Sequence, residues 1–284
     1  MALTLMYITN NPQVALIAQE AGVDRVWVDL EYIGKEQRQA GMNTVKSHHT
    51  VEDVSRVRKV VTTSQLQVRV NPIHEATSDY CDSKDEIDAV IKAGAEIVML
   101  PMFKTPEEIY RFVEYVDKRA RVLLLLETRE AAERIDEILA VPGIDEMYVG
   151  LNDLHLSYGQ KFMFQPLCDG KMDRLAEKIK AKGLSFGFGG IARVGFGMLP
   201  AEYIIGEHYR LGSTAAILSR GFCNMNMVDN PEDVRDLFID GVHNIRIKEA
   251  ECEKYSDEQF ALNHEEVVRR VNQIVSDIEG KQMQ

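Results

Sequence analysis

The chain has few of the features that mark several common protein classes. Its four cysteines, Cys81, Cys168, Cys223 and Cys252, are too scattered to form a metal-ligand pair or a redox dyad. We therefore expect free thiols in a reducing cytoplasm. No apolar run approaches the roughly 18 residues of a membrane span, and the run Val122–Leu126 has only the length of a strand. No basic segment followed by an apolar run is present near the start, so no secretory signal is expected.

Positive charge is also scarce. The 33 Lys and Arg residues against 45 Asp and Glu residues give a formal net charge of −12. This argues against a nucleic-acid partner, because a protein that tracks phosphates needs a basic face. A small anionic substrate remains compatible, since a local cation or a helix N-terminus is enough to bind it. No Ser/Pro-rich linker divides the chain, so we expect one domain, with a barrel over about residues 1–254 and a helical extension over about 255–284.

The chain does contain an eightfold alternation of a short apolar segment with an amphipathic one. We expect strands at Leu3–Thr9, Arg25–Glu31, Gln65–Val70, Glu96–Leu100, Arg121–Leu126, Glu146–Leu151, Leu184–Phe188 and Ser213–Leu218. The intervening helices are expected at Pro12–Gly22, Val51–Val61, Lys84–Ala93, Thr105–Val116, Glu130–Leu139, Lys171–Lys182, Pro200–Tyr209 and Pro231–Lys254.

Eight strand–helix units favour closure into a (β/α)8 TIM barrel over a doubly wound open sheet. No G-x-G-x-x-G turn follows the first expected strand, so the dinucleotide-binding alternative lacks its phosphate-binding loop. One more helical segment, Asp257–Ile278, lies beyond the eighth unit. Such a helix packs on a neighbouring subunit or covers an end of the barrel, and we favour a homo-oligomer.

Charged residues follow several expected strands, where TIM barrels place their chemistry. Alternate residues of a strand share a face, so Leu123, Leu125 and Glu127 are expected to point together into the barrel. The same alternation would put four residues along strand six on one face: Met147, Val149, Leu151 and Asp153. Two converging carboxylates repel each other unless a cation lies between them, so Glu127 and Asp153 are candidate ligands of Mg²⁺ or Mn²⁺. The alternative is that Glu127 caps the next helix and Asp153 closes a turn.

An arginine beside such a metal site would suit a 2-keto acid. Arg69 lies at the end of the third strand and could grip a substrate carboxylate through its planar fork. The cation and the arginine could together stabilise the enolate that develops in aldol cleavage. The expected partners are a small 2-keto acid and an aldehyde or related acceptor.

Five segments carry a resemblance to a known family. They are VWVDLE (Val26–Glu31), VRVNP (Val68–Pro72), VMLPMF (Val98–Phe103), LLLETREA (Leu124–Ala131) and VGLNDLHLSYG (Val149–Gly159). In this order and spacing they resemble the HpcH/HpaI aldolase and citrate lyase family of pyruvate- or phosphoenolpyruvate-related barrels. The resemblance implies a metal site at Glu127 and Asp153, a substrate-binding Arg69, and an anion pocket completed by the backbone amides of Asn152 and Asp153.

The chain departs from the aldolase branch of that family at two positions. Tyr32 stands where the aldolases have a histidine that takes part in proton transfer, and Leu125 stands where they have a glutamine. Both changes lean towards the citrate lyase branch. The segments GFGGIARVG and RLGSTAAILSR, over the last two expected strands, are more similar to the aldolases. The chain is therefore identified as a divergent member.

The group that moves the proton is left open by this departure. The long connection after Tyr32 holds His48 and His49, and a histidine suits general acid–base work near neutral pH. His155, two residues after Asp153, is another candidate, and a metal-bound hydroxide could act without any side chain. The alternatives are that His49 or Thr50 caps the next helix and that His155 packs beneath a loop.

A glycine-rich stretch ends the seventh strand and is followed by Arg193. TIM barrels often bind phosphate beside strands seven and eight, so Gly190 and Arg193 are candidates for binding the acidic end of a substrate. Close backbone packing is the other explanation for the glycines.

The leading functional hypothesis is a metal-dependent carbon–carbon lyase of the class II aldolase type that makes or consumes pyruvate or a related 2-keto acid. A citrate lyase beta-type enzyme acting on an acyl-coenzyme A thioester is the second possibility. A non-catalytic barrel that binds a small acid is the third, because the family histidine is absent.

Overall fold

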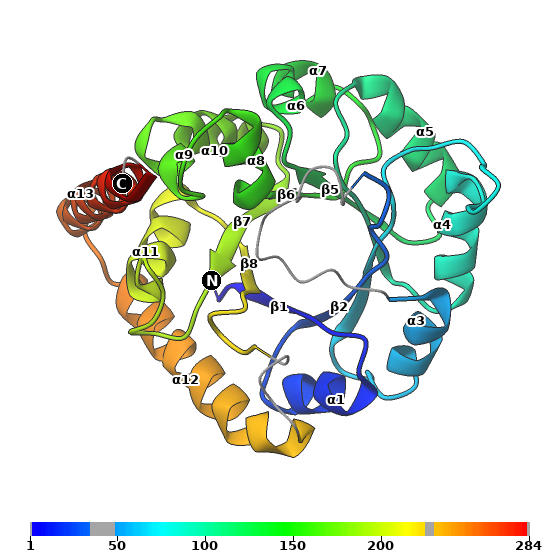
Figure 1. Cartoon of the computed structure of the whole chain (residues 1–284), viewed down its shortest axis with the longest axis horizontal. Coiled ribbons are helices and arrows are strands. Elements are labelled where there is room, and N and C mark those ends of the chain that lie inside the picture. Colours follow the sequence, from blue (N-terminus) through cyan, green and yellow to red (C-terminus); the bar gives the residue numbers. More distant parts are fainter. Residues whose placement is uncertain (1, 35–48, 225–229, 283–284) are drawn as a thin grey trace.

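The computed structural model describes residues 2–34, 49–224 and 230–282. Each strand of its closed parallel barrel pairs with the next strand in the chain, and β8 pairs with β1. Helices surround the barrel on the outside (Figure 1). The predicted (β/α)8 TIM barrel is thus confirmed. The strands are β1 (Thr4–Ile8), β2 (Arg25–Asp29), β3 (Gln65–Arg69), β4 (Ile97–Leu100), β5 (Arg121–Leu126), β6 (Glu146–Val149), β7 (Ser185–Ile191) and β8 (Ala215–Leu218).

The described helices follow the predicted order, with two short additions after β6. None of them is long and apolar enough to cross a membrane. They are α1 (Pro12–Glu20), α3 (Val51–Arg58), α4 (Ser83–Lys92), α5 (Pro106–Val116), α6 (Arg129–Glu133), α7 (Ile135–Leu139), α8 (Leu151–Ser157), α9 (Gln165–Cys168), α10 (Lys171–Ala181), α11 (Ala201–Leu211), η2 (Pro231–Val234), α12 (Arg235–Cys252) and α13 (Asp257–Gln282).

Side-chain caps explain where two of these helices begin. The Thr105 hydroxyl accepts a hydrogen bond from the backbone amide of Glu108, and the Glu108 carboxylate accepts one from the backbone amide of Thr105. Pro106 occupies the first turn of the helix. Thr50 and Asp53 form the same reciprocal box at the start of α3. Thr50, and not His49, is therefore the cap of that helix.

The inside of the barrel is a small apolar layer closed by an ion pair at the amino ends of the strands. The layer is formed by Met6, Trp27, Ile97, Met99, Leu123, Leu125, Tyr148 and Ala215. Below it, Arg25 on β2 donates two hydrogen bonds to Glu146 on β6, at 2.7 and 2.9 Å. Both side chains are buried, so this pair is a structural closure at the end of the barrel that serves stability.

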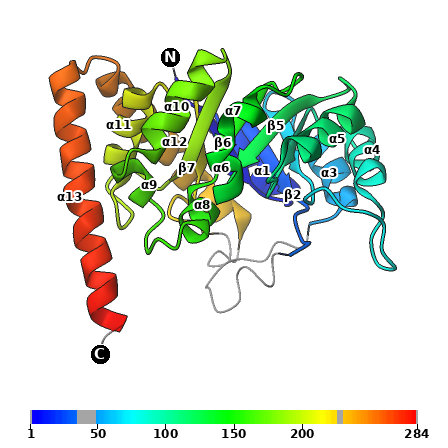
Figure 2. The same cartoon turned by 90° about the horizontal axis from the view of Figure 1, so that it is seen from above.

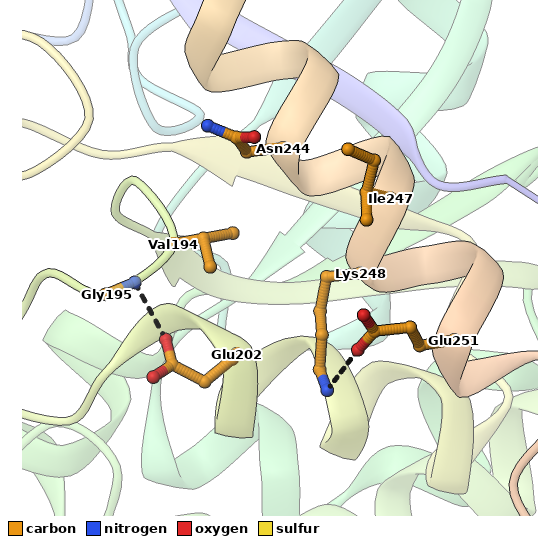
Figure 3. A pocket seen from close by; sticks show the side chains of 7 residues that line it. All are labelled: Val194, Gly195, Glu202, Asn244, Ile247, Lys248 and Glu251. Atoms are coloured by element: carbon orange, nitrogen blue, oxygen red, sulfur yellow. Dashed lines mark hydrogen bonds and ion pairs between the residues drawn. The ribbon is translucent and has the colours of Figure 1, made fainter.

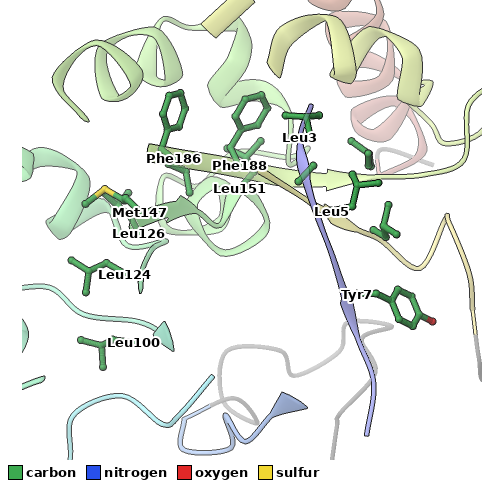
Figure 4. Packing of buried hydrophobic residues seen from close by; sticks show 14 of the residues in the cluster. Leu3, Leu5, Tyr7, Leu100, Leu124, Leu126, Met147, Leu151, Phe186 and Phe188 are labelled. Atoms are coloured by element: carbon green, nitrogen blue, oxygen red, sulfur yellow. The ribbon is translucent and has the colours of Figure 1, made fainter. Parts of the chain in front are cut away.

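A second and larger apolar layer fills the space between strands and helices. Figure 4 shows part of it, with Phe186 and Phe188 of β7 and Tyr7 of β1 among its side chains. These residues alternate along their strands with the residues that face the barrel interior. The layer fixes the helices on the barrel and leaves the carboxyl ends of the strands to carry the site.

The C-terminal helix α13 packs along the flank of the barrel, beside α11 (Figures 1 and 2). Val267 and Val271 are fully buried in this contact. Asn263 donates hydrogen bonds to the backbone of Tyr203 and to the buried carboxylate of Glu207. The predicted extra helix is thus present and is held by its own chain. Homo-oligomerisation stays a prediction.

Candidate active site

A cavity of about 170 Å³ lies at the carboxyl ends of the strands. Its walls come from β2, β3, β5, β6, β7 and β8 and from the first turn of α8. This is the end of the barrel where TIM-barrel enzymes carry their active sites. The lining residues are Trp27, Arg69, Leu125, Glu127, Tyr148, Gly150, Leu151, Asn152, Asp153, Met163, Gly189, Gly190 and Ile217.

Arg69 is the most firmly held polar group of this cavity. Its Nε and Nη2 donate to the two carboxylate oxygens of Asp29, both at 2.8 Å, and its Nη1 lies 3.1 Å from Glu31. The guanidinium also lies over the ring of Trp27, 4.9 Å from its centroid. Three of the five N–H groups of the fork are thus engaged, and no acceptor for the other two is found among the described residues. The structure therefore places Arg69 where the sequence predicted it, with its orientation fixed in advance.

Electrostatics keep this arginine charged. Burial alone would lower its pKa, but the carboxylates of Asp29, Glu31 and Glu127 together raise the pKa well above its ordinary value. The contribution of Glu127 shows that its carboxylate lies near the guanidinium. Arg69 therefore carries a permanent positive charge beside the acidic group that the sequence singled out.

Glu127 follows β5 and is 3% exposed. Its Oε1 accepts a hydrogen bond from the backbone amide of Met102 at 3.2 Å. A Cβ atom at Gly150 would lie 2.7 Å from its Oε2, so the absence of a side chain at Gly150 makes room for the carboxylate. The cap of α6 is Thr128. The alternative that Glu127 caps that helix is therefore wrong.

Asp153 reaches the cavity by a route that the sequence did not predict. The expected strand Glu146–Leu151 ends at Val149, and the chain turns at Gly150 into α8. Met147 and Val149 do share a face, as predicted, but that face is turned towards the helices, and Tyr148 faces the barrel interior. Asp153 lies in the first turn of α8, and no residue that the structure describes hydrogen-bonds or ion-pairs with its carboxylate.

The acid–base candidates lie apart from the cavity lining. His49 accepts a hydrogen bond at Nδ1 from the backbone amide of Asp29, at 3.0 Å. Tyr32 is 44% exposed and stacks on Tyr80, with ring centroids 5.5 Å apart. His155 is buried and its Nδ1 lies 3.2 Å from the carbonyl oxygen of Leu151 one turn earlier. His48 lies outside the described residues.

Burial also decides the state of His155. Its surroundings lower its pKa below the ordinary value, mainly through desolvation, so the ring is neutral at neutral pH. A neutral histidine that bonds its own helix backbone is a packing residue. The alternative interpretation of His155, packing beneath a loop, therefore describes it better than catalysis.

Of the two anion-binding candidates near the glycine-rich end of β7, one lines the cavity and the other does not. Gly189 and Gly190 line the cavity. Arg193 does not, because its guanidinium lies over the ring of Phe196, 4.2 Å from the centroid, and its Cγ lies close to Gly241 of α12. The structure thus brings Gly190 to the site and directs Arg193 away from it.

Several lining residues were missed by sequence reasoning. Trp27, Tyr148, Met163 and Ile217 are apolar or aromatic, and such residues in strands read as core. A signal for Trp27 was available, because it alternates with Asp29 on β2. The lining of the cavity is consequently more apolar than the charged residues alone suggested.

A second hollow of about 480 Å³ lies between α12 and the loop that follows β7. Figure 3 shows that its charged side chains Glu202, Lys248 and Glu251 are already engaged. Glu202 accepts a hydrogen bond from the amide of Gly195, and Lys248 lies 3.0 Å from Glu251. This hollow is outside the barrel mouth, and it carries no convergent group of the kind found around Arg69.

The fold is that of a TIM barrel, with a charged cavity at the carboxyl ends of its strands. Comparison of the sequence with known families makes this more specific. The HpcH/HpaI aldolase/citrate lyase family matches residues 3–163, and the chain belongs to that family. The resemblance carried by the five sequence segments is thus confirmed.

Individual relatives are more distant. A stretch of 83 residues is 39% identical to a hydroxypyruvate/pyruvate aldolase of Rhizorhabdus wittichii, and it covers 25% of this chain and 32% of that protein. The chain thus matches about a third of that relative's length. Among solved structures, an HpcH/HpaI aldolase from Desulfitobacterium hafniense has a TM-score of 0.60 at 18% identity, covering 77% of this chain and 86% of that one. An HpcH/HpaI aldolase/citrate lyase family protein from Burkholderia cenocepacia also has a TM-score of 0.60, at 16% identity over 82% and 95%. These structural matches show the fold.

Proposed function

We propose that this chain is a divalent-metal-dependent carbon–carbon lyase of the class II aldolase type, which cleaves or forms a 2-keto acid such as pyruvate. The observation that carries the proposal is the convergence of Glu127, Asp153 and Arg69 on one small cavity at the barrel mouth. Membership of the aldolase/citrate lyase family supports the reaction class.

The two carboxylates fit a hard divalent cation. They offer oxygen ligands only, which Mg²⁺ and Mn²⁺ prefer, and Mg²⁺ is commonly held by one or two carboxylates with water and substrate completing its shell. Among the described residues no group of three or more His, Cys, Asp or Glu side chains could form a closed site. Glu127 and Asp153 would therefore hold the cation in an open site. When bound, it would supply a Lewis acid that stabilises enolate charge.

The protein's own groups would bind and orient the keto acid. Arg69, already fixed by Asp29 and Glu31, directs its remaining N–H groups at a carboxylate or carbonyl oxygen. The backbone amides of Asn152 and Asp153, in the first turn of α8, would complete the anion pocket. The volume of about 170 Å³ suits a small acid with a short acceptor.

The proton-transfer group is proposed to lie outside the lining residues described above. Burial raises the pKa of Tyr148, so this lining residue keeps its proton at neutral pH. Nδ1 of His49 accepts a hydrogen bond from the Asp29 amide, so a neutral ring carries its proton on Nε2. It could act as a base only after giving up that bond. His48, His49 and Tyr32 thus stay candidates to be separated by pH–rate profiles of His48→Gln, His49→Gln and Tyr32→Phe.

The test is exchange of the pyruvate methyl protons in D₂O, followed by proton NMR with Mg²⁺ or Mn²⁺ present. We expect exchange by the wild type and a loss of about 100-fold or more in Glu127→Gln and in Asp153→Asn, because even the supporting partners of metal ligands are worth 10–100-fold. Glu202→Gln is the matched control, since Glu202 also accepts a backbone amide but lines the outer hollow. Unchanged Mn²⁺ affinity in both site variants would refute the proposal. A wild type that neither exchanges pyruvate nor binds oxalate would favour the non-catalytic interpretation.

A further inference from the structure

Tyr148 crosses from one strand to the strand after next inside the barrel. It lies on β6 directly opposite Gly187 of β7, and its side chain is 1% exposed. A Cβ atom at Gly187 would lie 2.4 Å from Cε2 of the tyrosine and 2.5 Å from the carbonyl oxygen of Ala215 on β8. The ring therefore occupies the space over Gly187, and only glycine fits beneath it.

The hydroxyl of Tyr148 enters the hydrogen-bond ladder between β7 and β8. It accepts a bond from the backbone amide of Ile217 at 2.8 Å. It donates its single proton towards the carbonyl oxygens of Gly189, at 2.6 Å, and Phe188, at 2.9 Å. The pairing of β7 with β8 is irregular at this point, because Gly187 pairs with Ala215 and the next regular pair is Gly190 with Ile217. The side chain thus hydrogen-bonds to backbone groups of both strands where their pairing is irregular.

This irregularity shapes the cavity wall. Two residues of β7, Phe188 and Gly189, stand opposite one residue of β8, which is the pattern of a β-bulge. Gly189 has a φ of +56°, in the left-handed region that favours glycine. Gly189 and Gly190 line the cavity. The bulge therefore presents glycine backbone to the ligand space, on the wall away from Arg69.

We propose that Tyr148 is a positioning residue that holds this bulge and thereby sets the Gly189–Gly190 wall against which the substrate is seated. Without the hydroxyl, the part-buried Ile217 amide and one carbonyl would lose this partner, so β7 would shift towards regular pairing to replace it. The wall would move with it. The kinetic part of this inference rests on the proposed function, whereas the structural part does not.

Tyr148→Phe tests the inference, and Tyr7→Phe is its matched control. Tyr7 is also a buried strand tyrosine, 3% exposed, whose hydroxyl contacts a backbone carbonyl, that of Cys223, but it lies in the outer layer and not in the cavity. Amide hydrogen exchange, read by mass spectrometry, should speed up about tenfold or more at residues 185–191 and 213–218 in Tyr148→Phe only, as expected for backbone that opens locally. Equal exchange in the wild type and Tyr148→Phe would overturn the inference.

Kinetics then separate positioning from simple destabilisation. A less stable enzyme loses active molecules, which lowers kcat and leaves KM unchanged. A displaced wall should instead raise KM for pyruvate, or the Kd for oxalate, by about tenfold or more, because small misplacements of bound substrate are costly. The single tryptophan, Trp27, lines the cavity and reports oxalate binding by fluorescence. Faster exchange with unchanged KM and Kd would overturn the positioning role. If the wild type binds no ligand, the proposed function fails, and the exchange comparison alone decides the role of Tyr148.

Discussion

His208 should make this protein lose stability in mild acid. The ring is fully buried between α11 and β7, stacked on Phe188 at 3.9 Å, and its Nδ1 lies 2.8 Å from the hydroxyl of Ser213. Within the described part of the chain, its Nε2 has no hydrogen-bond partner. Desolvation accordingly lowers its pKa to about 3. In the folded protein this histidine is therefore neutral both at neutral pH and in mild acid.

The magnitude follows from linkage. In the unfolded chain the histidine titrates near its ordinary pKa of about 6.5. Between about pH 6.5 and 3 the unfolded state binds a proton that the folded state refuses, so the free energy of unfolding falls as pH falls, by about 1.4 kcal/mol per pH unit. At pH 5 the loss is about 2 kcal/mol relative to pH 7.5, and it levels off near pH 3.

Urea unfolding at pH 7.5, 6 and 5, followed by the fluorescence of Trp27, measures this slope. His208→Asn removes the titrating ring. Between pH 7.5 and 5 the free energy of unfolding of this variant should therefore fall by about 2 kcal/mol less than that of the wild type, whatever its stability at pH 7.5. His155, whose pKa burial also lowers, adds to the slope of both proteins equally. Exposed His243→Asn is the control and should leave the slope unchanged. Parallel losses of stability in the wild type and His208→Asn would refute the reasoning.

Two further predictions concern the barrel ends. Glu146→Gln leaves the buried Arg25 without its charged partner, so the free energy of unfolding should fall by about 3–5 kcal/mol. The thermal midpoint should fall by about 10 °C. Arg25→Met combined with Glu146→Leu should recover most of this stability, and no recovery would contradict the ion-pair explanation. Gly150→Ala puts a methyl group 2.7 Å from Oε2 of Glu127 and should weaken Mn²⁺ binding by about tenfold or more, as measured by titration. Gly280→Ala is the control: its methyl group meets no atom within 4 Å, so Mn²⁺ binding should be unchanged.

The order of strands and helices could be predicted because a parallel barrel repeats one physical pattern. Buried strands such as Arg121–Leu126 read as short apolar runs, and caps such as Thr105 with Pro106 mark helix starts locally. The eight strands found lie within two or three residues of their predicted bounds. Closure of the barrel followed from the number of units, and not from any single residue.

The location of charged residues at the cavity was predicted correctly where they end a strand, as at Arg69 and Glu127, whereas their roles stay predictions. The inward face of strand six was mispredicted, because Met147 and Val149 are as suitable for the barrel interior as for the layer beneath the helices. Hydrophobicity alone cannot choose between two apolar faces of a strand that is buried on both sides. The hydroxyl of Tyr148 fits the interior because the β7–β8 bulge supplies its hydrogen-bond partners.

The hydrogen bonds of the structure sort the acidic residues at the barrel mouth into two pairs with different partners. Sequence analysis singled out Glu127 and Asp153 as candidate metal ligands but assigned no partner to Asp29 or Glu31. In the structure, Asp29 and Glu31 are bonded to Arg69 and fix the plane of its guanidinium, whereas Glu127 is oriented by a backbone amide. The first pair therefore orients the guanidinium of Arg69, and the second pair is the one that we propose to bind a divalent cation. A lysine at position 69 could not sustain this division, because a point charge cannot span both oxygens of Asp29 and still keep N–H groups in a fixed direction for the substrate.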